Sequence, residues 1–225
     1  MHIEPEIVTG AKLLLSYATA TVSFGLVAKS AYQSIKESGL STLMIRSMLA
    51  ILSVFVFFQV FPHHPVGVSE VHLILGSTLF LILGPAAAAI GLIGGLLAQG
   101  VFFAPFDLPQ FGMNVTTLLL PLFAMSVIAR KIISNNTAYV DIKYSQAFKL
   151  SLTYQGGIVA WVAFWAFYGQ GFNAENLASV GAFSGAYLTV VLLEPLVDIA
   201  ILAAAKAING LQGTGLVYKR LYQAS

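Results

Sequence analysis

The stretch Val71–Phe103 reads VHLILGSTLFLILGPAAAAIGLIGGLLAQGVFF and contains no Asp, Glu, Lys or Arg. A helix that crosses a bilayer needs about 20 mostly apolar residues. These 33 residues are therefore too many for one ordinary crossing, and they predict either one tilted span or two short ones. Gly84-Pro85 divides the stretch into halves of about 12 and 18 residues, because proline cannot donate inside a helix and glycine permits a turn.

The rest of the 225-residue chain has the same character, with 58% hydrophobic and 9% charged residues. A soluble domain carries about 25% charged residues. The composition therefore excludes a soluble enzyme, a nucleic-acid binder and a disordered linker. The net charge of +2 is too small to indicate a polyanionic partner, and the chain has no Gly-rich phosphate motif. We expect no nucleotide and no organic cofactor, and the lipid bilayer as the surroundings.

Five further apolar runs predict the remaining membrane segments: Leu13–Ala28, Leu43–Phe61, Gly112–Ala129, Leu150–Phe172 and Leu177–Ala205. Basic residues cluster between these runs and after the last: Lys29, Lys36 and Arg46; Arg130, Lys131, Lys143 and Lys149; Lys206, Lys219 and Arg220. Lys and Arg near span ends favour the cytoplasm. All three clusters can lie there only if Val71–Phe103 crosses twice or re-enters. We therefore predict an all-α, polytopic membrane protein of about seven transmembrane segments, with the N-terminus outside and the C-terminus cytoplasmic.

The loops expected on the outer side contain no Lys or Arg: Pro62–Glu70, Ala104–Phe111 and Gly169–Asn176. The acidic opening Met1–Glu6 lacks the basic start of a secretory signal, so we expect the N-terminus to be retained. The chain has no Cys, and any bound metal must be held by nitrogen or oxygen.

Two histidines are candidate metal ligands on the outer side. The amine of Met1, the backbone nitrogen of His2 and its imidazole can supply three nitrogens to one ion, and a fourth would complete a square plane suited to nickel(II), copper(II) or cobalt(II). His72 lies at the outer end of the long apolar stretch and is the candidate for that fourth nitrogen. A solvated terminal residue and an interfacial histidine are the alternatives for these positions.

Other polar residues are weaker candidates for a functional role. His63 and His64 form a pair in an outer loop that could gather metal, although such histidines are commonly only solvated. Gln99, Asn114 and Gln155 could orient a ligand or bond across helices. Glu194 and Asp198 stand at i and i+4 on one helix face, where a pairing with Arg46, a partner contact or a proton step is possible.

Five motifs, in order, resemble the CbiM/NikM family, the cobalt and nickel substrate-binding membrane components of energy-coupling factor transporters. They are Met1-His2-Ile3, Ser69-Glu70-Val71-His72-Leu73, Leu83-Gly84-Pro85-Ala86, Leu96-Leu97-Ala98-Gln99 with Phe102-Phe103, and Gly112-Met113-Asn114. The resemblance implies a seven-segment helical domain over residues 1–225 in the bacterial cell (inner) membrane. It also implies Co²⁺ or Ni²⁺ as the transported substrate, with Met1, His2 and His72 as ligands. Gln99 and Asn114 remain our candidates, from their own chemistry, for residues that orient these ligands.

The resemblance further implies an ATPase of the energy-coupling factor type, a transmembrane coupling subunit and a small accessory membrane protein as partners. The chain departs from the family at Glu4-Pro5-Glu6-Ile7 and in the loop Phe103–Phe111. The choice between cobalt and nickel, and between a complex and a solitary transporter, therefore stays open. Two other classes stay as alternatives: an intramembrane enzyme that uses Glu194 and Asp198, and a scaffold subunit that docks through the Gly- and Ala-rich surface of residues 86–98.

Overall fold

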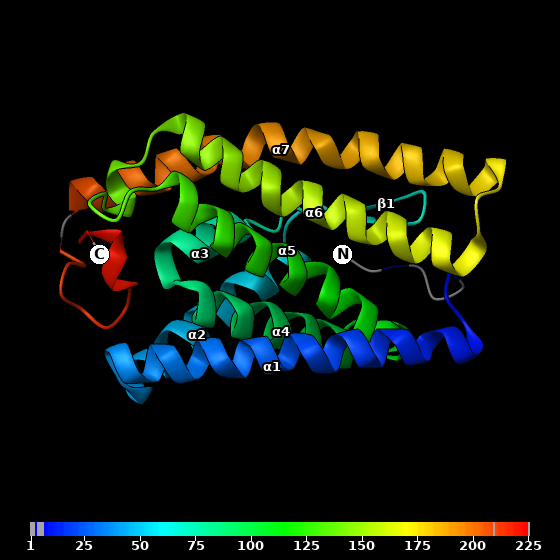
Figure 1. The fold of residues 1–225 in the computed structure, drawn as a ribbon, viewed down its shortest axis with the longest axis horizontal. Coiled ribbons are helices and arrows are strands. Elements are labelled where there is room, and N and C mark those ends of the chain that lie inside the picture. The colour runs from blue at the N-terminus through cyan, green and yellow to red at the C-terminus, as the bar shows by residue number, and fades with distance from the viewer. Residues whose placement is uncertain (1–2, 4–6, 209, 225) are drawn as a thin grey trace.

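Long helices run back and forth along one direction in the computed structural model, as Figure 1 shows. The structure describes residues 3, 7–208 and 210–224. The long helices are α1 (Leu13–Ser38), α2 (Leu40–Gln59), α4 (Pro85–Phe102), α5 (Phe111–Ile132), α6 (Tyr144–Gln170) and α7 (Ala174–Ile208). In the described part of the chain, these six are long and apolar enough to cross a membrane.

Shorter elements connect the long helices. Between α2 and α4 lie the strands β1 (His64–Val66) and β2 (Ser69–Val71) and the helix α3 (Gly76–Leu83). Four 3-10 turns complete the structure: η1 (Gly10–Lys12), η2 (Pro105–Gln110), η3 (Tyr139–Asp141) and η4 (Lys219–Leu221). Each predicted apolar run coincides with one helix or, for Val71–Phe103, with two, although the boundaries differ. Helix α1, for example, ends at Ser38 and not at Ala28, whereas α2 ends at Gln59, two residues before the end of its run. A charged residue ends an apolar run without ending the helix, because a Lys side chain can reach water from a buried backbone.

The break predicted in the long apolar stretch is confirmed. Gly84 has φ 85° and ψ 163°, a conformation that glycine adopts readily, and it separates α3 from α4. Pro85 opens α4 at a position where its missing N–H costs nothing. The sequence thus located this turn correctly from two residues.

The first half of the stretch differs from a simple membrane helix. Residues 72–75 are neither helix nor strand, and α3 has only 8 residues, about 12 Å of helix against a hydrocarbon core of about 30 Å. Every residue of α3 except Ile82 is buried, and α3 packs against α4, α5, α6 and α7. Non-helical backbone is tolerated between the apolar helices where protein surrounds it.

An antiparallel hairpin replaces the expected outer loop Pro62–Glu70. His64 is opposite Val71 and Val66 is opposite Ser69. At the turn, Gly67 has φ 61°, and a Cβ there would lie 2.1 Å from the backbone oxygen of Ser179, so the turn packs tightly on α7. The all-α prediction is therefore wrong in this one place, because the short run with proline and glycine carries too little pattern to indicate two paired strands.

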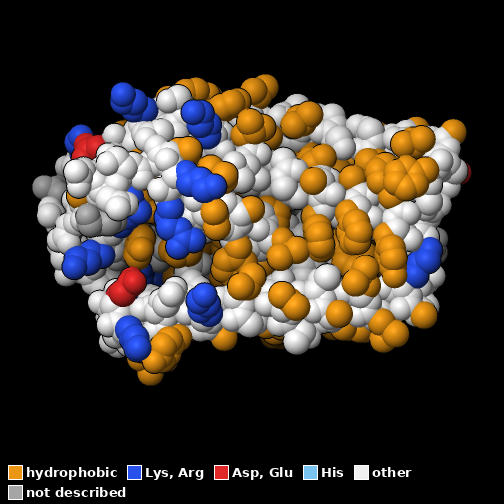
Figure 2. Space-filling model, viewed as in Figure 1, with side chains coloured by type: hydrophobic (Ala, Val, Ile, Leu, Met, Phe, Trp, Pro, Cys, Tyr) orange, Lys and Arg blue, Asp and Glu red, His pale blue; other side chains and the backbone are white. Residues whose placement is uncertain are grey.

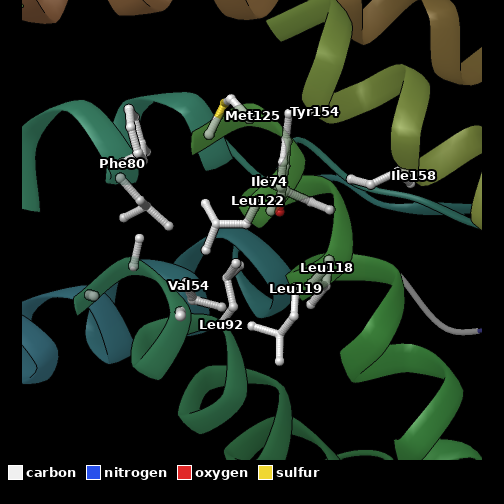
Figure 3. Packing of buried hydrophobic residues seen from close by; sticks show 14 of the residues in the cluster. Val54, Ile74, Phe80, Leu92, Leu118, Leu119, Leu122, Met125, Tyr154 and Ile158 are labelled. Carbon is white, nitrogen blue, oxygen red and sulfur yellow. The ribbon is translucent and has the colours of Figure 1, made fainter. Parts of the chain in front are cut away.

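The small residues of α4 pack against other helices inside the bundle. A Cβ on Gly91 would lie 2.3 Å from the Cβ of Ala50, and one on Gly95 would lie 2.4 Å from Val54, so α2 and α4 approach closely along this surface. Figure 3 shows the adjoining core, where Leu92 of α4 faces Leu119 of α5. Internal packing explains this surface without a partner subunit.

The ends of the bundle differ in charge. Figure 2 shows Lys and Arg side chains gathered at the end that holds the C-terminus, while hydrophobic side chains cover the middle. Ten of the eleven basic residues lie toward that end of the helices, and Lys12 lies at the other. Arg46 lies near the start of α2, inside the predicted run Leu43–Phe61, and its side chain is buried.

Candidate metal site

His72 follows β2 directly and is buried, with its Nε2 atom 2.9 Å from Oε2 of Glu70. Alternate residues of an extended chain point to the same side, so residues 70 and 72 share a face. The sequence placed Glu70 only at the end of an outer loop and within the motif Ser69–Leu73, and it did not indicate this pair. The i, i+2 spacing indicates the contact only once a strand is expected here.

Aromatic rings surround His72. The ring of His63 stacks on it with centroids 5.0 Å apart and planes 9° apart, and the ring of Phe58 lies 5.2 Å away. His64 is exposed in β1. Of the two loop histidines proposed to gather metal, the structure therefore brings only His63 to His72.

Ile3 holds the start of the described chain beside this histidine. It is buried, it forms an antiparallel bridge with Ser69, and its backbone N–H donates to Oδ1 of Asn114 at 2.9 Å. Asn114 is buried in the first turn of α5 and thus ties the N-terminal segment to that helix. Met1 and His2, the other two ligands expected from the sequence, lie outside the described residues.

Several polar residues lie on neighbouring elements. Gln99 is buried in α4, and Asp107 is buried in η2. A small pocket between α4, η2 and α5 is lined by Asp107 and Asn114 together with apolar side chains. The loop expected at Ala104–Phe111 is therefore a turn of 3-10 helix folded onto the site.

The described side chains do not form a complete metal site. Within residues 3, 7–208 and 210–224, no group of three or more His, Asp or Glu side chains could hold an ion. His72 contributes imidazole nitrogen, the ligand type that cobalt, nickel and copper accept in a nitrogen-rich site. An ion at His72 therefore needs further donors.

Glu194 and Asp198 form a separate buried cluster on α7. Oε2 of Glu194 accepts from Ser151 Oγ and from Gln155 Nε2, each at 2.7 Å. Asp198 accepts from Ser77 Oγ at 2.7 Å and from Thr78 Oγ1 at 2.5 Å. The cluster joins α7 to α3 and α6.

The predicted pairing of these acids with Arg46 is not seen among the described contacts. Arg46 donates instead to the carbonyl of Leu83 at 3.2 Å and to Ser34 Oγ at 3.1 Å. The backbone N–H of Ser77 donates to Oε1 of Glu194 at 3.3 Å, so a carboxylate of α7 serves the N-terminus of α3, where the side chain of Leu75 provides no cap. Gln155 bonds across helices, as the sequence allowed.

A solved structure described as the crystal structure of a transition metal transporter has a similar fold. The two chains align with a TM-score of 0.68 at 17% identity, over 93% of this chain and 94% of that one. At this identity the likeness shows the fold alone. No curated protein sequence gives a match.

The match to a protein-family model extends well beyond the sequence motifs, which end at Asn114. The model of the CbiM family, described as the cobalt uptake substrate-specific transmembrane region, matches residues 2–210. This range includes the His72 cluster, the hairpin and all six long helices. The chain therefore belongs to the CbiM family of cobalt uptake transmembrane proteins.

Proposed function

We propose that this membrane component of transition-metal uptake captures Co²⁺ or Ni²⁺ from the outer side through nitrogen ligands of Met1, His2 and His72. Family membership supports metal uptake by a multi-pass membrane protein. In this proposal residues 1–225 act as one transmembrane substrate-binding domain.

The contact of Ile3 with Ser69 is the observation that carries the proposal. In an antiparallel bridge, lower residue numbers on one strand run alongside higher residue numbers on the other. Our proposal requires this antiparallel course to continue ahead of Ile3, which would bring the first two residues alongside Glu70 and His72. This direction favours ligands from the first two residues of the chain.

The contact of His72 with Glu70 supports a ligand role for the histidine. A metal-bound histidine usually donates its other ring N–H to a carboxylate or carbonyl, which fixes the tautomer and the orientation of the ring. Here the carboxylate of Glu70 lies at Nε2. We therefore assign Nδ1 as the atom that binds the ion, with the rings of Phe58 and His63 limiting movement of the imidazole.

The distribution of charge supports capture from outside. Lys and Arg concentrate on cytoplasmic loops. The basic end of the bundle then faces the cytoplasm and carries the C-terminus, and the start of α1 lies at the other end (Figures 1 and 2). Transport across the membrane would require an ATPase of the energy-coupling factor type and a transmembrane coupling subunit, with a small accessory membrane protein as a further partner.

Metal titration of the purified protein tests the ligand set. Addition of one residue before Met1 moves the terminal amine and leaves every side chain intact, so we expect stoichiometric binding of Co²⁺ and Ni²⁺ to be lost. The matched control adds one residue after Ser225. Unchanged binding in the N-terminally extended protein would rule out the terminal amine as a ligand.

Purification from cells that also express the candidate partners tests the assembly. An ATPase and a coupling subunit that remain with the chain support the complex. Metal uptake by the chain alone in vesicles contradicts it and favours a solitary transporter.

A further inference from the structure

A groove of about 420 Å³ lies between α1, α4 and α5, toward the basic end of the bundle. Its walls include Leu26, Lys29 and Gln33 of α1 and Phe123, Val127 and Arg130 of α5. The groove is distant in the chain from β2 and from Ile3, and none of its lining residues belongs to the candidate metal site. It therefore needs an explanation of its own.

The chemistry of the groove changes along its length. On α1, Leu26 precedes Lys29, and on α5, Phe123 and Val127 precede Arg130 by about one or two turns. Both helices end toward the basic end of the bundle, α1 at Ser38 and α5 at Ile132. The apolar part of the groove thus lies nearer the middle of the bundle, and the cationic part lies nearer its end.

The groove continues into a recess of about 130 Å³, with which it shares Ser30, Gln33, Pro85 and Arg130. Arg46 lines this recess and is 1% exposed. Its Nε atom has no hydrogen-bond partner among the described residues, and no described carboxylate lies within ion-pair distance of its guanidinium. Glu37 also lines the recess. The groove and the recess taken together therefore carry a net charge of two positive units, from Lys29, Arg46 and Arg130 against Glu37.

A buried cation of this kind has a cost unless an anion compensates it. Phosphate fits the cationic part, and the apolar walls beside it fit a hydrocarbon chain. Basic pockets between transmembrane helices bind anionic lipid head groups in this way. A soluble anion would use only one half of the groove, so the arrangement favours a lipid.

We propose that the α1–α4–α5 groove binds an anionic phospholipid, with its phosphate at Lys29 and Arg130 and one acyl chain along Leu26, Phe123 and Val127. The lipid then also supplies negative charge to the recess of Arg46. A bound lipid would fix α1 to α5 at the basic end of the bundle.

Native mass spectrometry of the full chain in neutral detergent, combined with lipid titration, tests the proposal. We expect phosphatidylglycerol to be retained and to raise the unfolding temperature, while phosphatidylcholine has little effect. The double variant Lys29→Gln with Arg130→Gln should bind phosphatidylglycerol about 25-fold more weakly, at about fivefold for each basic residue near the membrane surface. The control is Lys131→Gln with Lys143→Gln, which removes the same charge at the same end but outside the groove.

Three outcomes would overturn the proposal. Equal weakening by the control pair would show that general surface charge attracts the lipid. Equal binding of phosphatidylcholine would show that Lys29 and Arg130 do not select for an anionic head group. Equal stabilisation by inorganic phosphate would assign the groove to a soluble anion, since the apolar walls would then contribute nothing.

Discussion

Two buried polar clusters occupy this apolar bundle, and they are built differently. The cluster around Glu194 and Asp198 joins three helices, and its carboxylates accept hydrogen bonds from side chains and backbone fixed on α3 and α6. The cluster around His72 joins a hairpin, a helix and a segment next to the chain terminus. The first is anchored entirely within the helical framework, and the second includes contacts of the hairpin and of Ile3, close to the start of the chain.

The difference predicts different roles. A buried polar group contributes to a unique structure when each of its hydrogen-bonding atoms has a partner. Glu194 and Asp198 meet this condition through hydroxyl and amide donors, which supports a structural role and gives no support to the alternative of an acid pair in catalysis. Changes in the Glu194 cluster should alter stability, and changes in the His72 cluster should alter metal affinity.

The largest effect is expected from His72→Ala. The variant removes the imidazole that we assign to the ion, so stoichiometric binding of Co²⁺ and Ni²⁺ should be lost in calorimetric titration. His64→Ala is the matched control, because that histidine is exposed in β1, and its affinity should stay within about twofold of the parent. Retained tight binding in His72→Ala would show that His72 is not a ligand. The distinction between a metal-binding cluster and a structural cluster would then fail.

Glu194→Ala should lower the free energy of unfolding by about 3 kcal/mol, because Ser151, Gln155 and the N–H of Ser77 would lose a buried acceptor. Thermal and chemical unfolding in detergent measure the loss. Glu194→Gln keeps one acceptor oxygen and should be destabilised by only about 1 kcal/mol.

Metal affinity in the folded fraction of both Glu194 variants should be unchanged. Normal stability of Glu194→Gln together with lost metal binding would contradict the separation of the clusters and would assign this acid a coupling role.

Glu70→Gln should weaken metal binding about 10- to 100-fold, the usual cost of removing a group that orients a metal-bound histidine. The glutamine oxygen can still accept from Nε2, but it carries no charge, so the imidazole becomes a weaker donor. Glu175→Gln is a suitable control, because it removes an acid from the first turn of α7, away from His72. Equal losses in both variants would indicate general attraction of cations by the outer surface.

Asn114→Leu should have the smallest effect, about fivefold weaker metal binding, since the acceptor for Ile3 N–H contributes about 1 kcal/mol. Thr117→Val is its control on the same helix, because among the described residues the Thr117 hydroxyl donates to the carbonyl of Met113, within α5 itself. A stability loss in Asn114→Leu without any change in affinity would place Asn114 in the structural class with Glu194.

Much of the helical framework was predictable from residue patterns. Apolar length located the six long helices, and Gly84-Pro85 located the break between α3 and α4. Helix ends were less predictable, as Ser38 shows, because the backbone continues as a helix beyond the membrane boundary. The hairpin was missed because its two strands have only three residues each, with Gly67 in the turn between them. Such short strands show no alternation of apolar and polar residues that would distinguish them from a loop.

The candidate site was only partly predictable. His72 was singled out as a rare polar residue at the end of an apolar stretch, and the structure buries it against Glu70. Asn114 was expected to orient a ligand or to bond across helices, and it proves to hold Ile3. Glu70 and His63 could not be assigned in advance, because their contacts with His72 depend on how the hairpin folds back.

The sequence by itself determined that this chain lies in a membrane, where its spans fall and which residues are chemically unusual. These properties follow from local composition, since the transfer of apolar side chains into lipid is summed residue by residue. Only the tertiary structure decided which unusual residues meet: His72 with Glu70 and His63, Ile3 with Asn114, and the α7 acids with α3 and α6. Such contacts join positions far apart in the chain, and they are selected by the need of each buried polar group for a partner.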